Sequence, residues 1–206
     1  MRRRTAKSPI INRLRLLLVV LCLTGLAAVM PGRAKADGEF VQLDWSDNGS
    51  LDAVLAMTRV PLNYSATYSK YDSGKTVGLS ILRLFPLETG GTVKIGPSFQ
   101  VSEDDDGDVD SLVGVKLGYE HFFALENGSL FALAEVNTIE SGYFGLLQFG
   151  LGQSGLSIEM SYGGSDTYEE TTLALSKRLG DGPMILRGGY KFVSDVAFLG
   201  IAINTF

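Results

Sequence analysis

Apolar and polar residues alternate along most of the chain from residue 39 onward, in segments of about ten residues separated by turn-forming residues. The alternation is clearest in residues 112–123, where valine, leucine and tyrosine alternate with glycine, lysine and glutamate. A period of two predicts β-strands with one apolar and one polar face, and no helical periodicity competes with it here. The sequence therefore predicts an all-β protein of antiparallel strands joined by hairpins.

The alternating segments number twelve, and an even number lets both ends of a sheet meet on the same side. The expected strands are residues 39–46, 51–60, 64–71, 76–85, 92–102, 112–123, 130–138, 143–152, 156–163, 170–179, 184–193 and 196–206. A missed or false turn at Pro61 or Ser154 would reduce the number to ten. The pattern thus predicts one antiparallel up-and-down barrel of about twelve strands, with ten as the alternative.

Several connections have recognisable turn chemistry. Asn48-Gly49 and Asn127-Gly128 favour hairpin turns, because such dipeptides readily adopt positive φ angles. Residues 139–142 are expected to form a turn. Pro97 lies within an expected strand and predicts a β-bulge there, since proline has no N–H to donate to the neighbouring strand.

The last segment, Val196–Phe206, reads VAFLGIAINTF and has no charged residue. In a soluble protein, a terminal strand this apolar would be an aggregation hazard if its edge were exposed. It is well explained as the closing strand of a barrel, paired on both sides and facing lipid. Ten residues of about 3.3 Å each, tilted in a barrel, give roughly the 25 Å height of a membrane barrel's apolar band.

Aromatic residues on the apolar face cluster near the segment ends, as in the two aromatic girdles of a membrane barrel. They are Trp45, Tyr64, Tyr119, Phe123, Tyr143, Tyr162, Tyr190 and Phe206. The alternative is a soluble barrel or sandwich exported to the periplasm, which alternation alone also allows. A soluble barrel would have its polar face outside, and that face would be richer in Lys and Glu. The pattern therefore favours the membrane.

The first 36 residues have the three parts of a secretory signal peptide. Met1–Arg15 is basic with no acidic residue, Leu16–Met30 is apolar, and Ala34-Lys35-Ala36 fits an A-x-A cleavage site. The alternative, a spanning helix, needs about 20 apolar residues. We expect cleavage after Ala36, which gives residues 1–36 as the signal and residues 37–206 as the barrel domain.

Cleavage changes both the cysteine content and the charge. It removes Cys22, the only cysteine, so the mature chain has no disulfide and no thiol nucleophile. Residues 37–206 keep ten of the 18 basic residues and all 23 acidic ones, a formal net charge of −13. Such an acidic surface argues against nucleic acid as a partner.

The pattern over Asp37–Phe206 resembles the small outer-membrane β-barrel proteins of Gram-negative bacteria, without a specific family motif. Phe206 resembles the C-terminal signal that the barrel-assembly machinery reads. Asn204 departs from that signal, which usually has an apolar or aromatic residue there. The resemblance implies a place in the bacterial outer membrane. It also implies outer-membrane lipid, lipopolysaccharide, and the secretion and barrel-assembly machineries as partners.

Eight charged residues fall on the polar, inward face of the expected strands. They are Lys94, Lys116, Glu120, Glu135, Glu159, Arg178, Arg187 and Lys191. In a dry lumen, unpaired charges are costly, so these groups must pair or meet water. Two interpretations stay open: a salt-bridged plug, or a narrow water-filled channel for small ions or solutes in which the excess of bases favours anions.

The most acidic stretch is read as a surface loop. Its acidic residues are Glu103, Asp104, Asp105, Asp106, Asp108 and Asp110. If both termini are periplasmic, the odd-numbered connections, including this loop, lie outside the cell. The stretch lacks the order of an EF-hand, since Val109 stands where glycine is needed, so no metal site is predicted. A surface-binding or adhesion protein acting through acidic loops is the runner-up function.

Catalysis has little support in the sequence. His121, the only histidine, falls on the apolar face, and no G-x-S-x-G motif is present. We therefore predict no enzyme activity, no catalytic residue and no cofactor. A lipid-active enzyme using His121 with a serine and an aspartate is the third alternative. The first choice is a structural barrel or a narrow, passive, porin-like channel.

Overall fold

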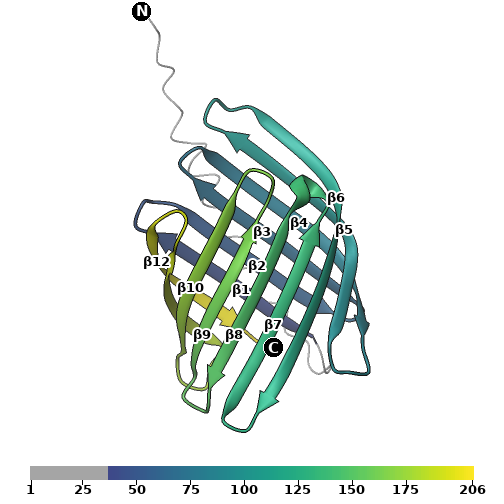
Figure 1. Cartoon of the computed structure of the whole chain (residues 1–206), viewed down its shortest axis with the longest axis vertical. Helices are drawn as coiled ribbons and strands as arrows, with labels where there is room; N and C mark the ends of the chain where they lie inside the picture. Colours follow the sequence, from purple (N-terminus) through teal and green to yellow (C-terminus); the bar gives the residue numbers. More distant parts are fainter. Residues whose placement is uncertain (1–36) are drawn as a thin grey trace, which may run out of the picture. The chain divides into compact units, whose positions relative to one another are not determined.

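The computed structural model describes residues 37–206, which form twelve antiparallel strands closed into a barrel (Figure 1). The strands are β1 (Gly38–Ser46), β2 (Leu51–Arg59), β3 (Leu62–Tyr71), β4 (Gly74–Pro86), β5 (Thr92–Asp104), β6 (Val109–Leu125), β7 (Gly128–Asn137), β8 (Tyr143–Leu151), β9 (Leu156–Gly164), β10 (Glu169–Arg178), β11 (Met184–Lys191) and β12 (Val196–Asn204). The 3₁₀-helix η1 (Ile139–Ser141) follows β7. The prediction of twelve strands is confirmed.

Each strand pairs with its neighbours in sequence, and β1 pairs with β12 to close the sheet. This closing pair runs from Phe40↔Asn204 to Ser46↔Phe198. Closure gives every strand two partners, so the apolar C-terminal strand has no free edge. The predicted up-and-down topology is therefore confirmed. The predicted signal peptide and its cleavage site lie outside the described residues, and there they stay predictions.

The two faces of the wall differ as the alternation predicts. On β12, Phe198 and Ala202 are buried, whereas Leu199 and Ile201 are exposed on the outside. Val113 of β6 is 78% exposed and Leu199 is 76% exposed. A continuous apolar outer surface of this kind suits contact with lipid and would aggregate in water. In residues 37–206, no helix has the length and apolar character needed to cross a membrane.

The barrel has two distinct ends. The start of β1, Gly38, and the end of β12, Asn204, lie at one end of the barrel, which we call the terminal end. The β5–β6 hairpin lies at the other, the hairpin end. β5 reaches Asp104 and β6 begins at Val109, so only residues 105–108 form the turn. The predicted acidic loop is therefore shorter than expected, because Glu103, Asp104 and Asp110 belong to paired strands.

The predicted bulge at Pro97 is wrong. Pairing keeps one register on both sides of the proline, at Ser80↔Ser98 and Arg83↔Ile95. Pro97 itself pairs with Val115 of β6. Space is provided by Gly96, where a Cβ would lie 2.1 Å from the carbonyl oxygen of Ile81. Close approach of the β4 backbone at this glycine accommodates the proline without an extra residue.

Candidate functional site in the lumen

The eight predicted charged residues all occupy lumen-facing positions of the barrel wall. They are Lys94 on β5, Lys116 and Glu120 on β6, Glu135 on β7, Glu159 on β9, Arg178 on β10, and Arg187 and Lys191 on β11. Contacts between strands that are not neighbours show that this face is the inside. Lys94 of β5 reaches Glu135 of β7, for example, although β6 lies between them.

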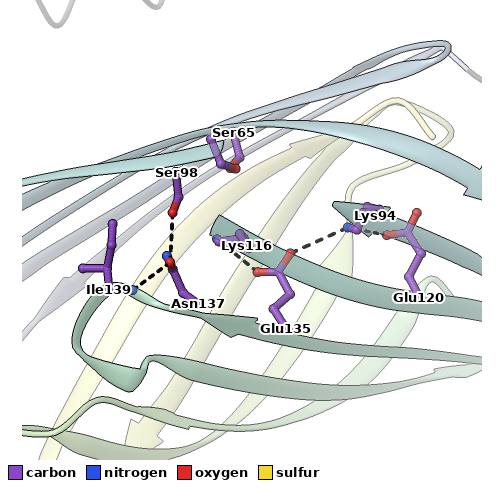
Figure 2. A network of polar contacts seen from close by, with 9 residues as sticks. Ser65, Lys94, Ser98, Lys116, Glu120, Glu135, Asn137 and Ile139 are labelled. Atoms are coloured by element: carbon purple, nitrogen blue, oxygen red, sulfur yellow. Dashed lines mark hydrogen bonds and ion pairs between the residues drawn. The ribbon is translucent and has the colours of Figure 1, made fainter. Parts of the chain in front are cut away.

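Four of these residues form a mixed-charge group, the Lys94 cluster, on β5, β6 and β7 (Figure 2). Lys94 Nζ lies 2.9 Å from Glu120 Oε2 and 3.7 Å from Glu135 Oε1. Lys116 Nζ lies 3.3 Å from Glu135 Oε2. A Cβ on Gly118 would lie 3.3 Å from Lys94 Cε and 3.4 Å from Glu135 Cγ. The glycine therefore leaves room for the buried lysine between its two carboxylates.

A second group, the Arg187 cluster, lies on β9, β11 and β1. Arg187 Nη2 lies 3.0 Å from Glu159 Oε1, and its Nε lies 3.3 Å from Asp44 Oδ1. The guanidinium carbon also lies 5.5 Å from the centre of the Phe198 ring. All three ionised side chains are nearly excluded from solvent, with side-chain exposures of 4% for Arg187, 11% for Glu159 and 6% for Asp44. Buried charges of this kind are stable only when paired.

Sequence reasoning missed three lumen-facing acids: Asp44, Asp52 and Glu170. Asp52 pairs with Lys191 across β12 and β1. Glu170 accepts hydrogen bonds from the backbone N–H groups of Val193 and Ser194, at 2.8 and 3.0 Å. The alternation in the first two strands was a sufficient signal, because Asp44 and Asp52 both stand opposite the apolar face.

These additional acids change the charge of the lumen. Leaving aside Asp104 and Asp110 beside the β5–β6 turn, the described wall has six lumen-facing acidic residues and five basic ones. The predicted excess of bases is therefore wrong, and with it the reason to expect anion preference. Arg178 has no ion pair within the part of the chain that the structure describes. Its Nη1 donates to the carbonyl oxygen of Gly182 at 3.3 Å, near the terminal end.

Open space remains beside the Lys94 cluster. A cavity of about 140 Å³ lies on the lumen side of β3–β7. Its polar lining consists of Ser65, Thr67, Ser98, Gln100, Lys116 and Asn137. Hydroxyl, amide and ammonium groups of this kind suit water or a hydrated solute. A wider hollow of about 390 Å³ lies at the acidic hairpin end, where Asp104, Asp108 and Asp110 contribute to its wall.

His121 lies on the outer surface, as the sequence predicts. Its ring stacks on Phe123 with centroids 3.9 Å apart, and its Nδ1 is 2.9 Å from the hydroxyl of Tyr119. Its side-chain contacts are with these aromatic rings, and the described hydrogen bonds include none from His121 to a serine or an aspartate. Among residues 37–206, no three His, Cys, Asp or Glu side chains are grouped to hold a metal ion.

Phe206 follows the end of β12 at the terminal end. A Cβ on Gly38 would lie 2.3 Å from Phe206 Cδ1, so the aromatic ring rests on the glycine backbone. The N–H of Phe206 donates to Asn204 Oδ1 at 2.9 Å. The ring itself is 61% exposed. Its role as an assembly signal stays a prediction.

Comparison with solved structures supports the same architecture. A KdgM porin aligns with a TM-score of 0.53 and 9% identity, over 81% of this chain and 98% of that chain. A structure described as KdgM porin in complex with disordered oligogalacturonate aligns with a TM-score of 0.52 and 8% identity, over the same shares. At this identity the likeness shows the fold alone. No protein-family model and no curated protein matches the chain. The chain thus has the fold of an outer-membrane β-barrel.

Proposed function

We propose that this protein is a narrow, passive, porin-like channel of the bacterial outer membrane, without enzyme activity. The proposal rests on the polarity of the two faces of the wall, which is the reverse of that in a soluble barrel. Exposed apolar side chains cover the outside, and charged and hydroxyl side chains line the inside. A barrel that served only as a rigid anchor would be more stable with an apolar, tightly packed interior, because buried charges carry a desolvation cost.

Strand number supports a passage of limited width. Barrel diameter grows with the number of strands: eight strands leave an interior that side chains just fill, and 16–18 leave a wide aqueous channel. The twelve strands formed by residues 37–206 lie between these limits. Two ion-paired clusters occupy part of the lumen, so the remaining path suits small ions and small polar solutes.

The outer membrane supplies the surroundings that this surface needs. The apolar band contacts lipid and lipopolysaccharide, with the terminal end in the periplasm and the hairpin end outside the cell. The alternative of a surface-binding protein has less support, because the acidic turn contains only residues 105–108. The oligogalacturonate named with the porin structure is an acidic sugar chain. The lumen of the present barrel has more acids than bases, which does not favour an acidic sugar chain.

Residues 37–206, refolded and inserted into a planar lipid bilayer, are expected to give discrete steps of conductance. The proposed function requires a water-filled path past the two charged clusters, and each step reports one such path. Folding is checked separately by the change in electrophoretic mobility on heating. A folded, heat-modifiable protein that inserts and gives no steps would contradict the channel and leave the salt-bridged plug as the explanation of the lumen charges.

A further inference from the structure

The connection between β7 and β8 turns at residues 139–142, as the sequence predicts, and its first residue packs into the lumen. Ile139 of η1 is only 6% exposed. Its Cγ1 lies 2.7 Å from the position that a Cβ on Gly114 would occupy, and Gly114 is a lumen-facing residue of β6. Figure 2 shows Ile139 on the same side of the wall as Ser98 and Lys116. The isoleucine side chain is therefore inside the barrel, near its hairpin end.

Specific contacts hold η1 in this inward position. Glu140 Oε2 accepts a hydrogen bond of 3.2 Å from Gln100 Nε2 of β5, which spans β6. Asn137 Oδ1 accepts from the N–H of Ile139 at 3.1 Å and from Ser98 Oγ at 2.9 Å. The carbonyl oxygen of Glu140 accepts from the N–H of Asp166, 2.9 Å away in the β9–β10 turn. The turn is thus fixed to the wall on both sides.

The backbone of this connection is that of a tight hairpin turn. Glu140 and Ser141 both have φ of 49°, and the N–H of Gly142 donates to the carbonyl oxygen of Ile139 at 2.9 Å. Type I′ hairpin turns require positive φ at both central residues, so the turn itself explains this conformation.

Ile139 lines the cavity of about 140 Å³ described above. The opposite side of that cavity includes Ser65 and Thr67 of β3, three strands away from Gly114 on β6. Ile139 is therefore an apolar side chain placed over an otherwise polar section of the lumen. The isoleucine therefore narrows this section of the lumen from the side of β6 and β7.

We propose that η1 is the constriction of the channel and that Ile139 sets the largest solute that passes. This inference rests on the proposed channel function. The solutes it admits are small hydrated ions and small polar molecules.

Two substitutions of opposite size test the constriction in bilayer recordings. We expect Ile139→Ala to raise single-channel conductance at least ~1.5-fold and to admit larger polyethylene glycols, and Ile139→Trp to lower conductance by a similar factor. The matched control is Ile201→Ala, which makes the same change on the lipid face and should leave conductance unchanged. Heat modifiability establishes that each variant is folded, and Ile139→Val serves in place of any variant that is not.

The outcomes separate this inference from the proposed function. If the unmodified protein conducts and both Ile139 variants match it, the constriction is overturned and the channel stands. If the unmodified protein is silent and Ile139→Ala conducts, η1 closes the lumen, and the constriction is supported. Silence in all variants overturns both proposals. Ser98→Cys introduces the only cysteine of residues 37–206. Its thiol should react faster with a thiol reagent in the Ile139→Ala variant than with Ile139 intact; equal rates would count against the constriction.

Discussion

Replacing Arg187 with methionine is expected to destabilise the barrel by about 3–5 kcal/mol, the usual cost of removing one partner from a buried ion pair. The guanidinium has carboxylates on both sides, Asp44 and Glu159. Without it, both carboxylates stay buried and face each other with no counter-ion. Methionine fills much of the arginine's volume, so the loss comes from the unpaired charges and only slightly from packing.

The position of Arg187 adds to this effect, because the cluster crosses the seam where the barrel closes. Asp44 is on the first strand and Arg187 on the eleventh, so their contact spans β12. Gly200 of β12 lies beneath the contact between Asp44 and Arg187. A Cβ on this glycine would be 2.0 Å from Asp44 Oδ1 and 3.1 Å from Arg187 Cγ. The glycine allows the two side chains to meet over the closing strand. Lys191 and Asp52 make a second ion pair across the same seam.

Urea unfolding of the refolded protein in lipid vesicles measures the loss, with fluorescence of Trp45, the only tryptophan, as the probe. Arg83→Met is the matched control, since Arg83 is on the lipid face of β4 and has no carboxylate partner in the described ion pairs. A triple variant that adds Asp44→Asn and Glu159→Gln should recover most of the stability, because no buried charge remains in the Arg187 cluster. Equal losses in the single and triple variants would show that packing, not charge, explains the effect.

The alternation of the sequence was sufficient to predict strands, faces and closure, because a period of two assigns each residue to the inside or the outside. It also placed His121 outside and Lys116 inside. Partners could not be predicted in the same way. Arg187 contacts Glu159 two strands away, and which residues of such strands reach the same height depends on strand tilt and stagger. Tilt and stagger are properties of the closed barrel, so they cannot be derived from any single segment of the sequence.

Two other features depend on local detail that periodicity does not contain. The inward turn at η1 needs space at Gly114 and hydrogen bonds from Gln100 and Ser98, which come from other strands. The unchanged register of β4 and β5 on both sides of Pro97 depends on a close backbone approach at Gly96. In both cases the missing side chain of a glycine makes room for a neighbouring group: for Ile139 at Gly114, and for the β4 backbone at Gly96. Glycine positions become informative only once the neighbouring strand is known.

We expect the channel to be more permeable to K⁺ than to Cl⁻. In a KCl gradient the reversal potential should therefore be displaced toward the equilibrium potential of K⁺. Within the described wall, lumen-facing acids already outnumber bases, and the hairpin end adds Asp104, Asp110 and Glu140. An acidic mouth raises the local concentration of cations and lowers that of anions. The preference should weaken from 0.1 M to 1 M salt, because the Debye length falls from about 10 Å to about 3 Å.

The triple variant Asp104→Asn, Asp110→Asn and Glu140→Gln tests the source of this preference. A change of about one kT in the potential at the mouth alters the cation-to-anion permeability ratio about sevenfold, so a decrease of that order is expected. Glu126→Gln, in the β6–β7 turn at the terminal end, is the control and should change the ratio much less. Anion preference in the unmodified channel would mean that Lys116 and its basic neighbours control permeation in spite of their ion pairs. The hairpin acids would then have no part in selectivity.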